Sequence, residues 1–263
     1  MSRDGSGVAG YVIALGNRLY REVRGAGGTS DAVLFLHGGF GTIEAFGPQI
    51  SALSPARSVH AYERPGHGRS ADVDGPYSYE HSLAEAVAYL DAEGLGAVDV
   101  VGYSDGAILG LLLALRHPER VRRLVAISAN LDPSGFGDTD AGAPVLPPRD
   151  SRVEAGVSGT SFEQDLERYR RLSPDGPEHA DAVLEKLMTL WRAEPSIAPE
   201  ALADVAAPVL VMAGDRDSIR VDHSLLIAAS LPNAELCIVP GASHGLVAER
   251  PALISLLIAE FLA

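Results

Sequence analysis

The sequence predicts an α/β fold in which a mostly parallel sheet is flanked by helices. Short apolar runs that end in glycine or polar residues alternate with longer stretches of helical periodicity. This alternation is typical of a parallel sheet covered by helices on both faces. The chain has 263 residues, of which 46% are hydrophobic and 21% are charged. One α/β domain with an insertion fits that length and composition.

The first half of the chain carries most of the predicted sheet. Residues 11–15 and 19–23 have the pattern of an opening hairpin. Four strands of buried character are predicted at residues 33–36, 59–62, 98–101 and 124–127. Helices are predicted between them, at residues 46–53, 82–93 and 107–116, and Pro118 ends the last of these.

The alternation of strands and helices breaks after residue 131. Residues 131–149 are rich in proline and glycine, and two helical segments follow, at residues 162–172 and 180–194. The alternation then resumes with strands at 209–212 and 235–239 and helices at 223–230 and from Pro251 onward. We therefore predict an eight-stranded core made of residues 1–131 and 207–263, with a helical cap inserted at residues 132–206.

Charge and composition argue against several classes of function. The chain has 21 Lys and Arg against 35 Asp and Glu, so its net charge of −14 repels phosphate backbones and anionic lipid surfaces. The longest apolar runs are too short to span a membrane, and residues 1–10 lack the apolar segment of a secretory signal. The single Cys237 suits a reducing compartment. We expect a cytoplasmic monomer or homodimer that acts on a small molecule, without a nucleic-acid or membrane partner.

Two segments match the G-x-S-x-G pattern of a nucleophile elbow, residues 102–106 (GYSDG) and 241–245 (GASHG). In such an elbow the serine sits on a tight strand-to-helix turn that leaves no room for side chains at the flanking glycines. The first segment follows a predicted strand and opens directly into a helix, whereas the second is expected to lead into a loop. Context therefore favours Ser104 as the nucleophile over Ser243. The alternative for Ser104 is a helix N-cap.

A serine nucleophile needs a general base within hydrogen-bond reach. His244 follows the last predicted strand and completes the order Ser, Asp, His that is usual for this kind of site. His37 and His67 lie in glycine-rich loops at the same edge of the sheet and are competitors. His60 falls within a buried strand pattern, where a core histidine is expected. We predict His244 as the base.

The acid that orients the base should follow a late strand. Asp215 and Asp217 both follow the strand predicted at residues 209–212. Asp215 adjoins a glycine turn and is expected to bind loop amides or to pair with Arg216. We favour Asp217, with Asp132 as a third possibility.

Five segments in succession resemble the signatures of the α/β-hydrolase family: residues 37–41 (HGGFG), 63–70 (ERPGHGRS), 102–106, 214–217 (GDRD) and 241–245. The resemblance runs from about residue 19 to 262, omits the predicted cap, and implies the α/β-hydrolase fold. The family more often has Asp where this chain has Glu63, which we interpret as a turn-stabilising acid. The resemblance also implies an oxyanion hole formed by the backbone N–H groups of Gly39 and Asp105, with Phe40 as the alternative donor.

The Ser104-Asp105-Gly106 sequence and Ala129-Asn130 resemble the valacyclovir hydrolase and biphenyl hydrolase-like branch. In that branch the acid after the nucleophile receives a substrate ammonium, so Asp105 is expected to select amino-acid esters. The alternative is that Asp105 only stabilises the start of the helix. Residues expected to contact substrate are Asp105, Phe40, Tyr103 and Trp191, and the cap residues Phe162, Tyr169 and Met188 either join them or form cap core.

The leading prediction for function is hydrolysis of a small carboxylic ester or lactone through an acyl-enzyme. The alternatives are hydrolysis of an amino-acid ester or amide, hydrolysis of a carbon-carbon bond as in ring-fission hydrolases, and a non-enzymatic ligand receptor on the same fold. The sequence contains no HExxH, CxxC or clustered-carboxylate motif, so no metal or other cofactor is expected.

Overall fold

The computed structural model describes residues 7–25, 28–137 and 161–263. Its eight strands form one sheet in the order β1-β2-β4-β3-β5-β6-β7-β8. The hairpin of β1 (Val8–Ala14) and β2 (Asn17–Arg24) is antiparallel, and β2 pairs antiparallel with β4 (Ser58–Tyr62). The remaining strands run parallel: β3 (Ala32–Leu36), β5 (Val98–Tyr103), β6 (Val121–Ile127), β7 (Val209–Arg216) and β8 (Ala234–Ser243). The predicted eight-stranded, mostly parallel sheet is confirmed.

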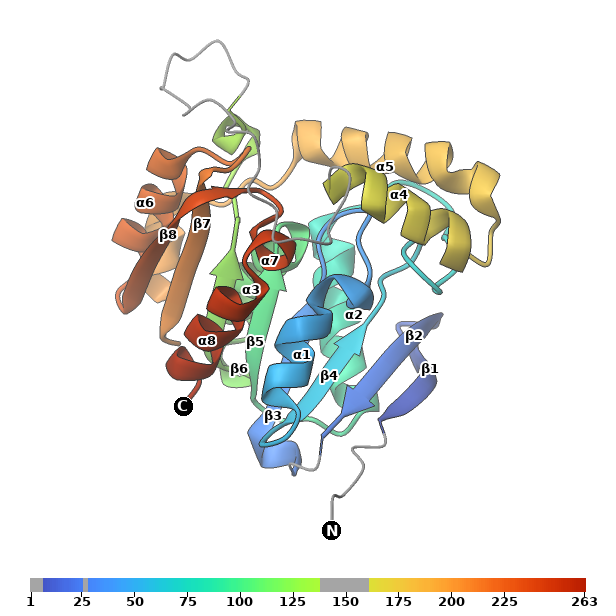
Figure 1. Ribbon diagram of the computed structural model, residues 1–263, viewed down its shortest axis with the longest axis horizontal. Helices are drawn as coiled ribbons and strands as arrows, with labels where there is room; N and C mark the ends of the chain where they lie inside the picture. Colours follow the sequence, from blue (N-terminus) through green and yellow to red (C-terminus); the bar gives the residue numbers. More distant parts are fainter. Residues whose placement is uncertain (1–6, 26–27, 138–160) are drawn as a thin grey trace.

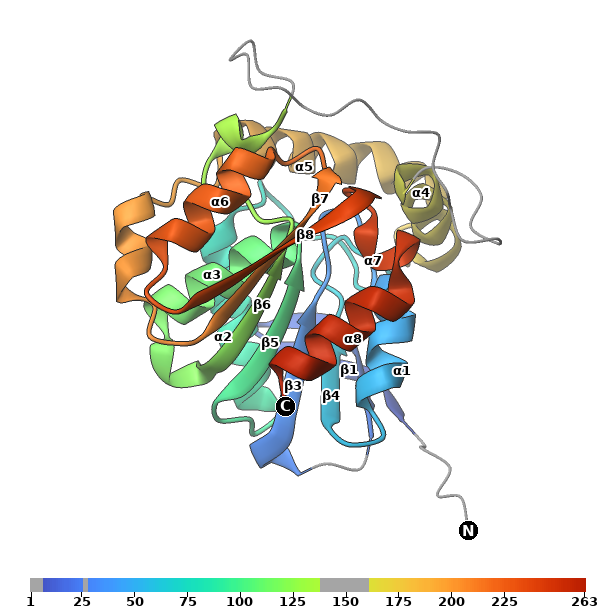
Figure 2. The ribbon, with the colours of Figure 1, turned by 60° about the vertical axis from the view of Figure 1, so that its left-hand side comes forward.

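Helices cover both faces of this sheet, and each face has its own apolar core. On one face pack α1 (Gly47–Leu53), α7 (Leu246–Glu249) and α8 (Pro251–Phe261) (Figure 2). On the other pack α2 (Tyr79–Ala92), α3 (Asp105–Arg116) and α6 (Val221–Ser230). Strands β3 and β5 are buried along their whole length because helices cover both of their faces.

Two helices, α4 (Ser161–Leu172) and α5 (Ala180–Ala193), lie over the end of the sheet where β3 and β5 finish (Figure 1). We call them the cap helices, since they fall within the predicted insertion. Residues 138–160, which belong to the same insertion, lie outside the described residues. The division into domains at residues 132 and 206 therefore stays a prediction.

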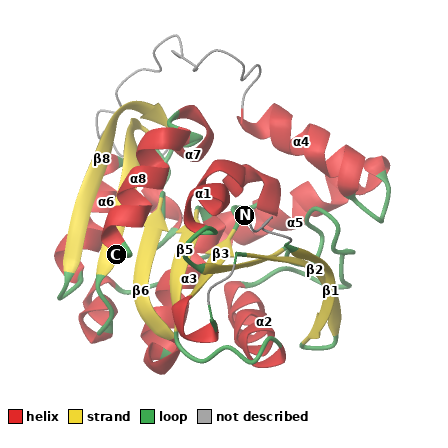
Figure 3. Cartoon of the chain, turned by 60° about the horizontal axis from the view of Figure 1, so that its bottom comes forward, coloured by secondary structure: helices red, strands yellow, loops and turns green. Residues whose placement is uncertain are grey.

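The ends of the sheet lie far apart, with β1 at one edge and β8 at the other (Figure 3). Among the described residues, no helix is long and apolar enough to cross a bilayer.

The α2 helix begins at Tyr79, three residues before its predicted start, because the Ser78 hydroxyl caps it by accepting a hydrogen bond from the His81 N–H at 3.2 Å. The short 3-10 helices are Thr29–Asp31, Ile43–Phe46, Pro118–Arg120, Pro133–Gly135, Pro177–His179 and Pro199–Asp204.

Candidate active site

Ser104 alone makes the turn between β5 and α3. The strand ends at Tyr103 and the helix begins at Asp105, so Ser104 has a φ of 53° and a ψ of −120°. A Cβ atom on Gly106 would lie 1.9 Å from the carbonyl oxygen of Leu36, and one on Gly102 would lie 2.2 Å from that of Gly106. Both glycines are therefore needed because backbone passes where a side chain would be. The left-handed φ at a non-glycine residue is the strained conformation expected of a nucleophile elbow.

Three side chains from distant segments form one hydrogen-bonded chain. His244, after β8, has its Nε2 3.1 Å from the Ser104 Oγ. Its Nδ1 lies 2.6 Å from Oδ1 of Asp217, which follows β7. Because a carboxylate only accepts, the proton of the neutral imidazole lies on Nδ1, and the Nε2 lone pair faces the serine hydroxyl. The structure thus brings the three predicted side chains together in the arrangement that general-base activation of a serine requires.

The carboxylate of Asp217 is buried and fully engaged. Ser128, just after β6, donates its hydroxyl to Oδ2 at 2.5 Å, and the N–H of Ile219 donates to Oδ1 at 2.9 Å. Burial raises the pKa of Asp217. The charge and hydrogen bond of His244, together with the two donors just named, lower the pKa by more than burial raises it, so the net pKa is below its usual value. Asp217 is therefore ionised at neutral pH and can hold His244 in one tautomer.

The acids around His244 raise the pKa of its imidazole. Burial lowers its pKa, but the charge and hydrogen bond of Asp217 raise it by more, with further contributions from Asp105 and Asp165, and the net pKa lies above 6.5. The loop that carries the imidazole is held by Tyr103, whose hydroxyl donates to the carbonyl oxygen of His244 at 2.8 Å. Tyr103 therefore fixes the base from the elbow itself, a role that its position in the motif did not indicate.

The two predicted oxyanion donors are Gly39 and Asp105, and Asp105 directly follows Ser104. As the first residue of α3, Asp105 has an N–H with no acceptor inside its helix, where the helix dipole also favours negative charge. A Cβ on Gly39 would lie 2.3 Å from Cζ2 of Trp191 and 2.8 Å from Oδ2 of Asp105. Only glycine fits between the two, which keeps the Gly39 backbone close to the elbow.

The carboxylate of Asp105 is already surrounded by donors. Its Oδ2 receives Nη2 of Arg64 at 3.2 Å, and its Oδ1 receives the Tyr79 hydroxyl at 2.9 Å and the Trp191 Nε1 at 2.8 Å. The side chain of Asp105 is 2% exposed. Its charge is thus paired with Arg64 inside the protein, so it is not the open acceptor that binding of a substrate ammonium would need. Its interactions also go beyond stabilising the start of α3.

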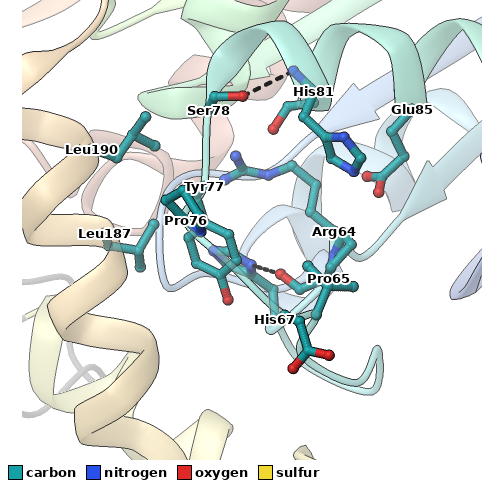
Figure 4. Close-up of a pocket in the computed structure, with 13 residues that line it drawn as sticks. Arg64, Pro65, His67, Pro76, Tyr77, Ser78, His81, Glu85, Leu187 and Leu190 are labelled. Carbon is teal, nitrogen blue, oxygen red and sulfur yellow. Dashed lines mark hydrogen bonds between the residues drawn. The ribbon is translucent and has the colours of Figure 1, made fainter.

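The competing histidines are bound elsewhere. The His37 Nε2 accepts the Arg64 N–H at 3.0 Å while its Nδ1 donates to the carbonyl of Gly38 at 2.7 Å, and burial and the nearby Arg64 lower its pKa to about 3. His67 donates from Nδ1 to the Pro65 carbonyl at 2.8 Å and lines a different, smaller cavity of about 100 Å³ beside the start of α2 (Figure 4). His60 is buried within β4, as expected.

The competing acids also have structural partners. Asp215 accepts the Gly241 N–H at 2.7 Å and lies 3.8 Å from Arg216, which are the two roles the sequence predicts for it. Asp132 caps the short helix Pro133–Gly135 through the N–H of Ser134 at 2.8 Å. Glu63 binds the N–H groups of Arg69 at 2.6 Å and Ile43 at 3.3 Å, which confirms its turn-stabilising role.

The second G-x-S-x-G segment differs from the expectation. The sequence predicts a loop after it, but the one-turn helix α7 begins at Leu246, because Glu249 accepts from both the N–H and the hydroxyl of Ser243 and closes the turn. The strand, turn and helix context is therefore present at both segments. What separates the two serines is that the Ser243 hydroxyl is bound to a carboxylate, whereas the Ser104 hydroxyl faces an imidazole.

A cavity of about 210 Å³ opens on Ser104 and His244. Tyr103, Asp105 and Trp191 line it, as predicted. Phe40 is a correction, because its ring does not line the cavity and instead stacks on Tyr169 of α4, with centroids 5.1 Å apart. Other described residues line it as well: Gly38, Gly39, Gly41, Ala45, Asn130, Phe136, Phe162, Asp165 and Ser218.

Two residues of the cap helices, for which the sequence leaves substrate contact and cap core open, are not among those that line the cavity. Tyr169 is 1% exposed and belongs to the core under α4, whereas Met188 is 42% exposed on α5. Sequence reasoning did not single out Ser128 or Asp165. Their only signal was position, since Ser128 follows a parallel strand at the same sheet edge as Ser104 and Asp165 lies on a predicted cap helix.

A model of the alpha/beta hydrolase family matches residues 33–255. The chain belongs to this family. Among its relatives, a protein of Caulobacter segnis named "Putative carbamate hydrolase RutD" is 30% identical over 244 residues, which cover 88% of this chain and 91% of that protein. The pimeloyl-acyl-carrier-protein methyl ester esterase of Yersinia enterocolitica is 27% identical, with 93% and 97% covered. The family and these names support a hydrolase role.

Solved structures of similar fold include Est816, an N-acyl homoserine lactone degrading enzyme, with a TM-score of 0.75 and 24% identity over 96% of this chain and all of that one. The CarC serine hydrolase of carbazole degradation gives a TM-score of 0.74 and 20% identity, with 98% and 99% covered. At these identities the likeness shows the fold alone. The resemblance to the valacyclovir hydrolase branch stays a prediction.

Proposed function

We propose that the protein is a serine hydrolase that cleaves small carboxylic esters or lactones through an acyl-enzyme intermediate. In this proposal Ser104 is the nucleophile, His244 the general base and Asp217 the acid that orients the base. The observation that carries the proposal is the unbroken chain from the Ser104 Oγ to the His244 Nε2 at 3.1 Å and from Nδ1 to Asp217 at 2.6 Å.

Each step uses a group already described. The Ser104 oxygen attacks the carbonyl carbon while the Nε2 of His244 takes its proton. The N–H groups of Gly39 and Asp105 receive the developing oxyanion, and loss of one such donor typically costs about 3 kcal/mol in the barrier. The imidazolium then gives its proton to the leaving alkoxide, which leaves as the alcohol. In the second half, His244 takes a proton from a water that attacks the acyl carbon, and it returns that proton to the Ser104 oxygen as the bond to the acyl group breaks and the acid is released.

The described lining suits apolar parts of a substrate of moderate size. Aromatic side chains from the core and the cap helices, Tyr103, Phe136, Phe162 and Trp191, form much of the cavity wall, and such walls bind apolar substrate parts. The name of the methyl ester esterase among the relatives supports ester cleavage. The carbamate hydrolase names support a second candidate, cleavage of a carbamate, because the same serine, base and oxyanion donors would serve that carbonyl.

The test is covalent labelling with a fluorophosphonate, which reacts with activated serines. We expect the label on Ser104, and loss of labelling in Ser104→Ala. Ser243→Ala is the matched control, because it removes the serine of the second motif and should leave labelling intact. A label found on Ser243 would overturn the assignment.

Turnover separates the proposal from its alternatives. Many turnovers on p-nitrophenyl acetate, lost in Ser104→Ala, support an ester hydrolase. A single stoichiometric burst of p-nitrophenol without turnover would support a ligand receptor. A panel of lactones, carbamates, amides and ring-fission dienoates then ranks the bond types by kcat/KM.

A further inference from the structure

Asp165 is an acid in the catalytic cavity that the proposed reaction does not use. It lies on cap helix α4, and its side chain is 21% exposed and lines the same cavity as Ser104 and His244. Burial has the largest effect on the pKa of each group; beyond it, the charge of His244 lowers the pKa of Asp165, and the charge of Asp165 raises the pKa of His244. The carboxylate therefore lies within electrostatic reach of the reacting groups.

The two acids of this cavity differ in how they are paired. Asp105 accepts from three donors, one of them the guanidinium of Arg64, and is closed to further ligands. Asp165 is bound through Oδ1 by Arg168, one turn along the same helix, at 2.7 Å. No described residue donates to its Oδ2. Within the described part of the chain, one oxygen of a carboxylate in the cavity thus has no donor.

The acids of the cavity are each paired with a cation outside its lining. Among the described residues that line it, Asp105 and Asp165 are acids and His244 can become cationic, while Arg64 pairs with Asp105 and Arg168 with Asp165. Burial raises the pKa of Asp165 to about 6, although Arg168 and His244 lower it, so the pairing with Arg168 does not fully compensate for removal of the carboxylate from water. A further positive partner would stabilise its ionised form, and a substrate carboxylate would be repelled.

We propose that Asp165 binds the ammonium group of a cationic ester, which makes Asp165 the residue that sets substrate charge preference. This inference rests on the proposed function and deepens it. The sequence pointed to Asp105 for this role, but the free oxygen belongs to the acid on the cap. The ammonium donates to Oδ2 of Asp165 while Arg168 keeps Oδ1, and the ester carbonyl lies at Ser104.

The experiment compares pairs of esters that differ only in charge. Ethyl ε-aminocaproate and ethyl heptanoate carry NH3+ or CH3 at the end of the acyl chain. Protonated 2-(dimethylamino)ethyl acetate and isopentyl acetate carry N–H+ or C–H at the matching position of the alcohol. We expect the wild type to prefer the cationic member of at least one pair. Asp165→Asn should lower kcat/KM for that member by about 10- to 100-fold, mainly through KM, since the charge of the carboxylate that attracts the ammonium is lost. Its effect on the neutral member should stay within about twofold.

Two further variants sharpen the comparison. Glu167→Gln removes the same charge from an exposed position two residues along α4 and should leave the preference unchanged. Arg168→Met removes the competing cation from Asp165 and, assayed at about pH 8, should increase the preference for the cationic ester. A preference that falls in Arg168→Met would contradict the proposal.

The inference and the proposed function fail in different ways. Equal loss on both esters of a pair in Asp165→Asn, or a wild type with no charge preference in either pair, would overturn the role of Asp165 while neutral esters are still hydrolysed. Activity that survives in Ser104→Ala would overturn the proposed function itself.

Discussion

The indole nitrogen of Trp191 donates to the carboxylate of Asp105 at 2.8 Å, which joins cap helix α5 to the residue that follows Ser104. The same indole lies against Gly39, where a Cβ would come within 2.3 Å of its ring. Trp191 therefore contacts both segments whose N–H groups form the proposed oxyanion hole. A shift of the cap helix α5 would move Trp191, and with it the two backbone segments that it contacts beside Ser104.

Replacing Trp191 by Phe should lower kcat more than it changes KM. The variant keeps a ring against Gly39 but, among the described residues, leaves Asp105 Oδ1 with Tyr79 as its one donor. Loss of a hydrogen bond to a charged group costs about 1.5 kcal/mol or more of stability. Because Asp105 also carries one of the proposed oxyanion donors, we expect its displacement to lower kcat on a neutral ester as well. Met188→Leu, on an exposed site of the same helix, is the control. Unchanged kcat with a higher KM would mean that Trp191 only contacts substrate.

Trp191 is also the single tryptophan of the chain, so intrinsic fluorescence reports on the cavity. Ligand that fills the cavity displaces water from the indole, and its emission should shift to shorter wavelength. The measurement is a titration of Ser104→Ala, which should bind ester without consuming it. Protein already blocked by a fluorophosphonate should show no further shift when ester is added to it. A shift that persists in the blocked protein would place the ligand elsewhere.

Activity on a neutral ester should rise with pH as His244 loses its proton. Only the neutral imidazole accepts the serine proton, and the net pKa of His244 is raised, so the midpoint of kcat/KM should lie above 6.5. The raised value means that the base is charged and inactive over a wider acidic range than a free imidazole would be. A pH-independent rate between about pH 5 and 8 would argue against His244 as the base.

Asp217→Asn should move the His244 titration to lower pH. The substitution removes the charge that raises the pKa while burial, which lowers it, remains. Proton NMR of the imidazole measures this shift directly in both proteins. At the same time kcat should fall by about 10,000-fold, because an amide does not hold the imidazole in the productive tautomer. Asp215→Asn, whose carboxylate binds the Gly241 N–H, is the matched control and should leave the titration in place.

Gly106→Ala should destabilise the protein, whereas Gly96→Ala should not. An alanine Cβ at 106 would lie 1.9 Å from the backbone oxygen of Leu36, and backbone would have to shift to admit it. Overpacking of this kind costs about 1–3 kcal/mol or more. Nothing lies within 4 Å of a Cβ at Gly96, so that variant should stay within about 0.5 kcal/mol of wild type. Thermal unfolding of the two variants checks the difference.

Much of the fold could be predicted from the sequence because its elements carry local signals. Buried runs such as residues 98–101 bounded by turn residues indicate strands, and the structure has a strand at each predicted position. Helix starts are less certain, because a capping side chain such as Ser78 can extend a helix beyond its apolar pattern. The one-turn helix after His244 was missed, since it depends on a contact between Ser243 and Glu249 rather than on periodicity.

The candidate site was predictable where a motif fixes it and not where partners come from unrelated segments. Motif spacing and strand order were enough to predict that Ser104, Asp217 and His244 lie close together. The donors around Asp105 come from a loop, from α2 and from α5, and no local pattern links them. The free oxygen of Asp165 likewise depends on how α4 lies over the sheet. The expected cytoplasmic location and the monomer or homodimer state stay predictions.

The proposed base is carried by the outermost strand of the sheet, whereas the proposed nucleophile is carried by a central one. A strand with a neighbour on one side only opens at a lower free-energy cost than a strand held on both sides. On warming, fraying at that edge would pull the imidazole from the serine while the middle of the molecule is still folded. Hydrolysis should then cease some degrees below the temperature at which the helical circular dichroism signal disappears.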